Sequence, residues 1–303
     1  MASTDLVTLS TVKSWLGLLN TDPARDTQLQ GLISQISLAI YNWCNRGFFL
    51  PQNVTEYYDG NGRDRIQLRN WPVGEIISLY INGTLVPPFL PPWPTPTVIP
   101  TTGPVAPIVP PPGVFITYDM PIYDTPGYIL EDASLDPPGD MQLLMLNAYT
   151  FWKGKSNVTV QYQAGYTIFS EPQTVPGTGP YTISVNAPWG PWGSNWSVTY
   201  ASSGIVLVAV VGTPAAGQYS VSGGVYTFSS ADASQALLIS YGYIPADITQ
   251  CALEWVQLRW AEKDRPGQVS KSLGGQETVS YKNEPIPKFI ELTLNNFRRV
   301  API

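Results

Sequence analysis

Residues 23–45 read PARDTQLQGLISQISLAIYNWCN, and this stretch decides how the first part of the chain folds. Its apolar side chains recur three and four positions apart, at Leu29, Leu32, Ile33, Ile36, Ala39, Ile40 and Trp43. That spacing places them on one face of an α-helix, and such a face is buried in a folded protein. Pro23 suits a first helical turn, and Gly47 stands where a left-handed residue can end the helix. We therefore predict a helix from Pro23 to about Asn45.

Three other segments have a helical pattern or helix boundary signals. Thr8 or Ser10 can cap a short helix that runs to about Leu18. Asp247 can cap a longer helix whose apolar stripe comprises Ile248, Cys251, Ala252, Trp255, Val256 and Leu258. Pro287 opens a short helix through about Asn296. We expect the first three of the four helices to bury five residues against one another: Trp15, Ile36, Trp43, Cys251 and Trp255.

Charge is confined to three parts of the chain. Residues 76–118 and 172–231 hold no Asp, Glu, Lys or Arg, whereas residues 1–75 and 248–303 hold 13 and 14 of the 38 charged residues. This distribution is typical of a soluble domain whose two halves are separated by long uncharged material. The formal net charge of −6 argues against a protein that binds nucleic acid by neutralising phosphates.

The middle of the chain favours strands and extended segments. Residues 54–58 and 65–69 flank a turn at Asp59-Gly-Asn-Gly62, which predicts a β-hairpin, and residues 76–81 form a third strand. From Pro87 to Pro112, 12 of 26 residues are proline, so this stretch is an extended arm and not part of a sheet. Further strands are predicted at residues 114–119, 128–130, 143–146 and 157–162.

Residues 172–231 are typical of a separate all-β unit. Short β-rich runs at 181–185, 196–200, 205–211, 219–221 and 225–228 are separated by Gly, Pro and Ser, and a last run at 236–241 comes after them. The strand that enters the unit ends in Gly165-Tyr166, and the strand that leaves it ends in Gly242-Tyr243. Within the unit, Trp189, Trp192 and Trp196 could pack on its core, contact a protein partner, or stack on sugar rings.

Little in the sequence indicates catalysis. The chain has no histidine, which removes the commonest general base and metal ligand. An acidic stretch comprises Asp119, Asp124, Glu131, Asp132, Asp136 and Asp140, without the regular spacing of a Ca²⁺ loop. It is a solvated surface, a metal site or, in a third interpretation, the carboxylate pair of a hydrolase. We expect no enzyme, no cofactor and no metal.

The two cysteines and the apolar segments indicate the cell compartment in which the protein folds. Cys44 and Cys251 both lie in helical patterns, and we expect reduced core residues, with a disulfide as the other interpretation. No run of 18 apolar residues predicts a membrane span, and the N-terminus lacks the pattern of a secretory signal. The cytoplasm of a cell, or a particle assembled there, fits best.

Taken together, the two ends carry an ordered set of motifs. The first end holds Val7-Thr-Leu-Ser-Thr-Val-Lys-Ser-Trp-Leu-Gly-Leu18, Asp26-Thr-Gln-Leu-Gln-Gly-Leu-Ile33, Thr55-Glu-Tyr-Tyr-Asp-Gly-Asn-Gly62, Leu68-Arg-Asn-Trp-Pro-Val73 and Ile76-Ile-Ser-Leu-Tyr-Ile-Asn-Gly83. The second end holds Ala252-Leu-Glu-Trp-Val-Gln-Leu-Arg-Trp-Ala-Glu-Lys-Asp-Arg265 and Ser272-Leu-Gly-Gly-Gln-Glu-Thr-Val-Ser-Tyr281. In this order they resemble the head–tail connector, or adaptor, proteins of tailed bacteriophages. The resemblance covers residues 6–86 and 245–303, with residues 153–166 as a further strand.

The resemblance implies a structural virion protein in the neck. It implies a twelve-subunit ring beneath the portal, which receives a stopper or tail-completion protein on its other side and lets DNA pass without specific binding. It also implies that a C-terminal segment docks on the portal, here Phe297, Arg298, Arg299, Val300, Pro302 and Ile303. Aromatic and Arg side chains favour interface hot spots. A frayed terminus is the other interpretation of this tail.

We therefore expect an α+β protein in five parts. Residues 1–86 and 244–303 form the two halves of a helical adaptor core, residues 87–113 the Pro-rich arm, residues 114–168 strands of or near the core, and residues 169–243 an inserted β domain. The arm, the acidic region and the β domain depart from the compact family pattern. The alternative function is another neck or baseplate protein whose β domain binds glycan or fibres.

Overall fold

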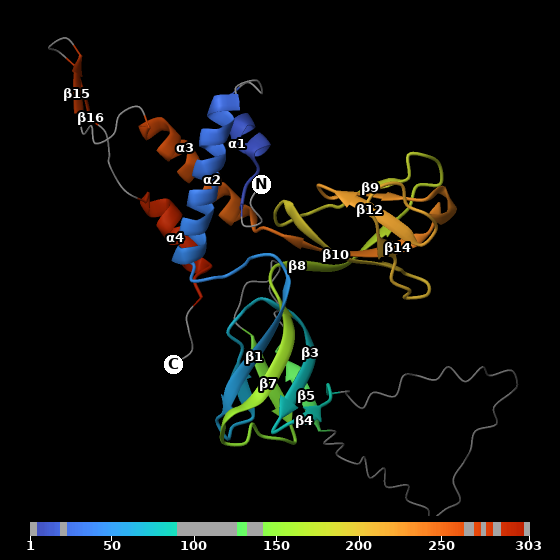
Figure 1. Ribbon diagram of the computed structural model, residues 1–303. Coiled ribbons are helices and arrows are strands. Elements are labelled where there is room, and N and C mark those ends of the chain that lie inside the picture. Colours follow the sequence, from blue (N-terminus) through green and yellow to red (C-terminus); the bar gives the residue numbers. More distant parts are fainter. Residues whose placement is uncertain are drawn as a thin grey trace, which may run out of the picture.

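The computed structural model describes residues 5–18, 23–89, 126–131, 142–263, 270–273, 277–280 and 286–299. Within these ranges the chain is a mixed α+β protein with four α-helices and five sheets. Figure 1 shows three bodies, which we call the helical unit, the first β unit and the second β unit. Each of the three has a hydrophobic core of its own.

The helical unit combines segments from both ends of the sequence. Its helices are α1 (Leu9–Trp15), α2 (Pro23–Trp43), α3 (Ala246–Glu262) and α4 (Lys288–Asn296). The helix α2 packs against the other three, and its buried stripe of Leu29, Ile33, Ile36 and Ile40 faces the apolar side of α3. Burial of this stripe stabilises the unit, because each fully buried Leu or Ile contributes about 1.5–3 kcal/mol.

The helix ends differ in part from the sequence predictions. Thr8 is the N-cap of α1, and its hydroxyl oxygen accepts from the amide of Thr11. Asn45, not Gly47, takes the left-handed conformation after α2, with a φ of 51°. Asp247 does not cap α3, because Pro245 is the N-cap and Asp247 lies within the first turn. There its carboxylate still lies at the positive end of the helix dipole.

The first β unit is formed by two sheets that enclose one core. Strand order is β1-β7-β3-β4 in one sheet and β2-β6-β5 in the other. The strands are β1 (Gln52–Gly60), β2 (Arg65–Gln67), β3 (Val73–Ile81), β4 (Thr84–Val86), β5 (Gly127–Leu130), β6 (Leu143–Asn147) and β7 (Gly154–Ala164). The long strand β7 is central, and it pairs antiparallel with both β1 and β3.

The predicted hairpin across residues 59–62 is wrong. The turn is present, but β1 pairs with β7 and β2 pairs with β6, so the two strands belong to different sheets. Gly62 donates its amide to the carbonyl of Phe151, and the amide of Phe151 donates to the carbonyl of Arg63. Long-range partners therefore hold both sides of this turn, and local spacing alone cannot reveal them.

The second β unit also consists of two sheets. Strand order is β10-β14-β8 in one sheet and β11-β12-β13-β9 in the other. The strands are β8 (Thr167–Thr174), β9 (Thr182–Ser184), β10 (Trp192–Tyr200), β11 (Val208–Ala209), β12 (Gln218–Ser222), β13 (Val225–Phe228) and β14 (Ala236–Tyr243), with a short 3₁₀ helix at Ser230–Asp232. Strand β8 was not predicted from the sequence. It is an edge strand, and it tolerates Pro172 for that reason.

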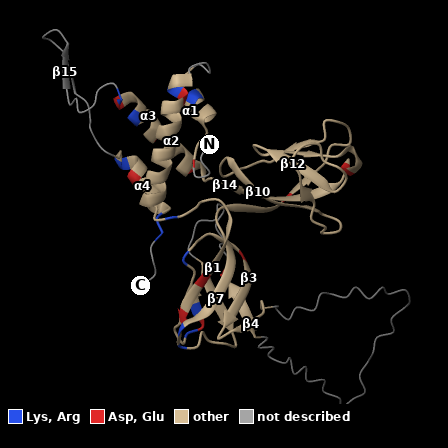
Figure 2. Cartoon of the chain, viewed as in Figure 1, with Lys and Arg blue, Asp and Glu red and all other residues tan. Residues whose placement is uncertain are grey.

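Carboxylates at the margins of the uncharged stretch have structural roles. Glu171 accepts hydrogen bonds from the Tyr241 hydroxyl, the Gln173 amide and the Asn186 backbone. Asp232 accepts from the Tyr200 hydroxyl at 2.6 Å. Both carboxylates are buried, and such multiple bonds offset the cost of removing a charge from water. Figure 2 shows how little charge the rest of this unit carries.

The two Gly-Tyr pairs meet where the second β unit joins the helical unit. The amide of Tyr243 donates to the carbonyl of Tyr166 at 3.1 Å, and their rings pack edge-to-face with centroids 5.7 Å apart. Both rings are buried in the helical core. The chain thus leaves and re-enters the helical unit at neighbouring points.

A tight backbone contact lies next to these tyrosines. Leu50 and Pro51, which lead from α2 to β1, pass directly against Gly165 and Gly242. A Cβ on Gly165 would lie 2.6 Å from the Leu50 oxygen, and one on Gly242 would lie 2.2 Å from Pro51 Cδ. Glycine is therefore needed at both positions for the three units to meet as they do. We call this region the joint; it comprises Leu50, Pro51, Gly165, Tyr166, Gly242 and Tyr243.

Several predicted segments lie outside the described residues. These are the arm beyond Phe89, the strand at 114–119 and residues 300–303. At the other end, β15 (Ser270–Leu273) pairs antiparallel with β16 (Glu277–Ser280). Figure 1 shows this hairpin extending away from α3 and α4.

Candidate functional site

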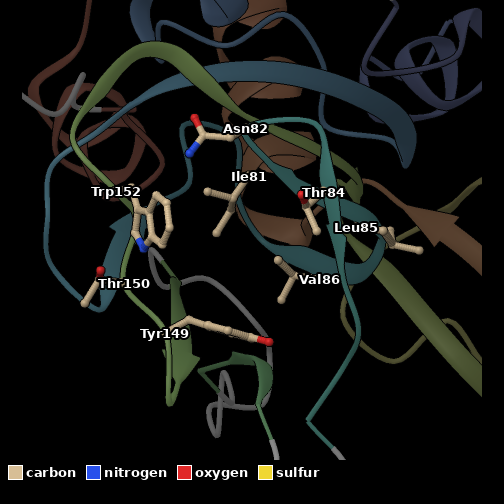
Figure 3. Close-up of a pocket in the computed structure, with 8 residues that line it drawn as sticks. All are labelled: Ile81, Asn82, Thr84, Leu85, Val86, Tyr149, Thr150 and Trp152. Carbon is tan, nitrogen blue, oxygen red and sulfur yellow. The ribbon is translucent and has the colours of Figure 1, made fainter.

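An open apolar pocket lies at one edge of the first β unit. It has a volume of about 200 Å³ and is lined by Ile81, Asn82, Thr84, Leu85, Val86, Tyr149, Thr150 and Trp152. Figure 3 shows Trp152 and Leu85 on opposite sides, with Ile81 and Val86 between them. Trp152 is 64% exposed, Leu85 57% and Tyr149 44%, so these side chains present apolar surface to an incoming molecule.

One wall of the pocket is a tight turn. Asn82 and Gly83 both have positive φ values, 51° and 79°, as a two-residue hairpin turn requires. The turn folds β4 back on β3 so that Ile81 pairs with Thr84 and Leu79 with Val86. Ile81 and Val86 are buried at the base of the pocket, whereas Leu85 is exposed.

The opposite wall is held in place by Asn157 at the start of β7. Its side-chain amide donates to the Trp152 carbonyl at 2.9 Å and to Asn82 Oδ1 at 3.1 Å, while its Oδ1 accepts from the Gly60 amide at 2.8 Å. Asn157 thus ties both walls together. Phe151 anchors the same loop, because its ring is fully buried in the core. Such a preformed cavity is suited to binding with little loss of conformational entropy.

The lining residues provide no acid, base or thiol. Their polar groups are the Asn82 amide, the hydroxyls of Thr84, Thr150 and Tyr149, and the Trp152 indole N–H. Such a set can orient a ligand by hydrogen bonds but offers no group for general acid–base work at neutral pH. The chemistry of the lining therefore suits binding and not catalysis.

A second feature is a buried arginine close to the joint. Arg46 is 8% exposed, and its guanidinium lies 3.7 Å from the ring centroid of Trp71. Its Nε donates to the Phe297 carbonyl at 2.7 Å, and its Nη1 donates to the Trp71 carbonyl. Burial lowers the pKa of Arg46 from its ordinary value. The aromatic face and the two carbonyls offset part of this desolvation.

The same region holds the C-terminal segment against the rest of the chain. Phe297 packs on the helical core with its ring centroid 6.1 Å from that of Tyr166. The amide of Arg299 donates to the Cys44 carbonyl at 2.8 Å, and its Nη1 donates to Asn70 Oδ1 at 2.7 Å. Phe297 and Arg299 are thus held by their own chain, and the portal contact of the segment stays a prediction. Arg298 is exposed, and Val300, Pro302 and Ile303 lie outside the described residues.

Most of the predicted core residues lie in the helical unit. Ile36, Cys251 and Trp255 are buried, and Trp43 is half-buried with its indole N–H donating to Asn295. The prediction for Trp15 is wrong, because this side chain is 46% exposed. It lies across α3 with its Nε1 bonded to Gln257, while Val12 fills the core position on α1.

The two cysteines are free and buried, as predicted. Burial is the main cause that raises the pKa of Cys44 to about 12 and that of Cys251 to about 11. Neither thiol is therefore ionised near neutral pH, and both behave as small apolar residues of the core.

The three tryptophans of the second β unit do not share one environment. Trp189 packs on the helical core beside Tyr243, with ring centroids 5.9 Å apart. Trp192 packs on the core of the second β unit and donates to the Tyr226 hydroxyl. Trp196 is partly exposed. For Trp189 and Trp192 the interpretation as core residues describes the contacts best.

Of the acidic stretch, only Glu131 belongs to the described residues. Its carboxylate accepts from the amide of Leu143 at 3.2 Å. Across the part of the chain that the structure describes, no group of three or more His, Cys, Asp or Glu side chains could hold a metal ion. In that part there is also no helix long and apolar enough to span a membrane.

The pocket was not predicted from the sequence. The feature of the sequence that could have indicated it is a pair of aromatic residues, Tyr149 and Trp152, in a loop between two strands. The opposite wall comes from residues more than sixty positions earlier, so local pattern could not place the two walls together. Comparison with known proteins adds no assignment, because no family model and no curated protein matches this chain.

Proposed function

We propose that this chain is a structural subunit of a tailed-bacteriophage neck, a head–tail adaptor that joins the portal vertex to the stopper or tail. The main support for the proposal is that the helices of the helical unit come from both ends of the sequence. The two segments with the resemblance, residues 6–86 and 245–303, are far apart in the sequence, yet they supply all of its helices. Between them in the sequence lie the arm, strands β5 to β7 of the first β unit, and the second β unit, which leaves and rejoins at the joint.

The proposed role is assembly without catalysis. A ring of subunits, twelve in the family that the chain resembles, surrounds a channel for DNA. The net charge of −6 favours a lumen along which DNA slides without being bound, because like charges repel. In the proposed ring we place the second β unit on the outside as an inserted domain, because its scarcity of charged side chains (Figure 2) suits contacts buried within the neck.

The portal contact is assigned to the end of the C-terminal segment. Phe297 and Arg299 bind their own subunit through Arg46, Cys44 and Asn70, so they are needed to orient residues 300–303. The exposed Arg298 and residues 300–303 are proposed to reach the portal. Aromatic or Arg anchors with apolar neighbours are typical of such interfaces.

The test is a binding measurement with the portal protein of the same virus. A variant that lacks residues 300–303 should keep the thermal stability of the full chain but lose portal binding by at least about tenfold, which corresponds to about 1.4 kcal/mol. Replacement of these residues by a Gly-Ser tetrapeptide is the matched control for chain length, and it should also lose binding.

The possible results separate two conclusions. Unchanged portal binding by the truncated variant would remove the role of the tail and leave the adaptor assignment intact. Failure of the full chain to bind the portal would overturn the adaptor assignment itself. The alternative of a glycan-binding or fibre-binding domain gains no support from Trp189 and Trp192, because these two side chains pack on different cores.

A further inference from the structure

The pocket of the first β unit has no role in the proposed adaptor function. It lies away from the C-terminal segment, and its exposed Trp152, Tyr149 and Leu85 are adjacent in one open cavity. Single exposed apolar side chains are common on protein surfaces, but a cluster around a cavity marks a binding site. The pocket therefore calls for an occupant whose chemistry matches its lining.

The chemistry of the lining favours a proline-rich segment in the polyproline conformation. Such segments dock in grooves lined by aromatic side chains, because proline rings pack flat on aromatic faces. Proline has no N–H, so its binding site needs few acceptors, and the carbonyls of the segment can accept from the Trp152 indole and the Tyr149 hydroxyl. The absence of charged side chains from the lining suits an uncharged ligand.

The chain itself contains such a segment, and it begins beside the pocket. Val86 lines the cavity, and the described chain stops three residues later at Phe89, the third residue of the arm. The chain returns at Pro126, and the two ends are bonded together: Phe89 N to the Tyr128 carbonyl at 2.8 Å, and Tyr128 N to the Pro87 carbonyl at 3.0 Å. Residues 87–112 include 12 prolines and no charge.

We propose that the pocket binds the chain's own Pro-rich segment, residues 91–112. A polyproline helix rises about 3.1 Å per residue, so 22 residues span about 70 Å, much more than the return to the pocket requires. Because the segment is tethered at the pocket wall, its effective concentration is on the order of millimolar, which favours its own pocket over that of a second copy. The proposal does not depend on the connector function.

The first experiment frees the pocket and supplies the segment as a peptide. In the linker variant, residues 90–125 are replaced by a short Gly-Ser linker; the bonded pair Phe89 and Tyr128 already brings the two ends together. A fluorescent synthetic peptide of residues 91–112 is titrated with this variant and with the intact chain, and fluorescence anisotropy is measured. The linker variant should bind the peptide at least about tenfold more tightly than the intact chain, whose pocket is already filled.

Substitutions locate the binding. Trp152→Ala in the linker variant should weaken peptide binding at least about tenfold, because the largest exposed face of the pocket is lost. Phe169→Ala is the matched control, since Phe169 is another exposed aromatic residue but belongs to β8. It should leave peptide binding unchanged.

A second measurement uses the intact chain and does not require the deletion to fold. Elastase cleaves after small aliphatic residues, and Val98 and Val105 lie within the segment. Trp152→Ala should accelerate cleavage at these two sites by about tenfold, because a docked segment is protected from a protease. Mass spectrometry identifies the sites, and Phe169→Ala again serves as the control.

Three results would overturn the proposal. The first is equal peptide binding by the linker variant and the intact chain, and the second is cleavage at unchanged rate in Trp152→Ala. The third is an intact chain whose mass in light scattering rises with concentration and falls to that of a monomer in Trp152→Ala, because the occupant would then be the segment of a second copy.

Discussion

Replacement of Gly165 or Gly242 by alanine should destabilise the joint, and the structure predicts a different loss of stability for each. Gly165 has a φ of 124°, which L side chains rarely adopt, and its Cβ would also meet the Leu50 backbone. Backbone strain of about 1–3 kcal/mol and overpacking of about 1–3 kcal/mol together predict a loss of about 2–6 kcal/mol in the free energy of unfolding. At Gly242 the main obstacle is the Pro51 ring, so overpacking alone predicts about 1–3 kcal/mol.

The assay is urea unfolding followed by far-ultraviolet circular dichroism, with the free energy of unfolding compared between variants. Gly47→Ala is the matched control, because nothing lies within 4 Å of its added Cβ. It should change stability by less than about 0.5 kcal/mol. If the free energies of unfolding of both joint variants lie within about 0.5 kcal/mol of that of this control, the close contact of Leu50 and Pro51 with the two glycines is refuted.

Three further predictions concern pH, the thiols and the pocket wall. Burial is the main cause that raises the pKa of Tyr41 and of Tyr166 to about 12, so their contribution to stability is complete below about pH 10 and is lost as pH rises to about 12. With no histidine in the chain, melting temperatures should stay level between about pH 6 and 8, and a marked slope there would contradict this. Cys44 and Cys251 should react with a thiol reagent only after denaturant is added, and fast labelling of the native chain would show that the core is open. Asn157→Ala should cost about 1–3 kcal/mol, because it leaves the Gly60 amide and the Trp152 carbonyl without this partner, whereas the exposed Asn53→Ala should be near neutral in the same melt.

The helices were predictable because each depends on a local pattern. The stripe from Leu29 to Trp43 has the period of a helix, and proline marks the starts of α2 and α4. Their ends were less certain. Asn45 takes the left-handed position, although Gly47 is the better residue for it on conformational grounds.

The pairing of the strands could not be predicted from local sequence pattern. The turn at residues 59–62 has the composition of a hairpin, yet its flanking strands pair with β6 and β7, which come some eighty to one hundred residues later. Composition describes which segments are extended, but register and partner depend on packing across the core. The missed strand β8 is a similar case, since Pro172 is tolerated only because the strand lies at a sheet edge.

The residues of the candidate site could be read from the sequence, but the fact that they form a pocket could not. The aromatic residues of the Trp152 loop and the arm of prolines are both visible in the sequence, but the pocket appears only when the Asn82 turn is placed opposite that loop by Asn157. Likewise, the arginines of the C-terminal segment are visible, but the bond from Arg46 to the Phe297 carbonyl is not. That bond holds the first part of the segment to its own chain.

The most direct test of the adaptor assignment is an electron cryo-microscopy map of the neck of the virion that contains this chain. The assignment predicts a ring of copies directly below the portal. The helical unit of each copy should lie next to the portal, and the second β unit should lie on the outside of the ring. A map that places this chain in the baseplate, on the tail tube or on the capsid surface, with another protein below the portal, would contradict it.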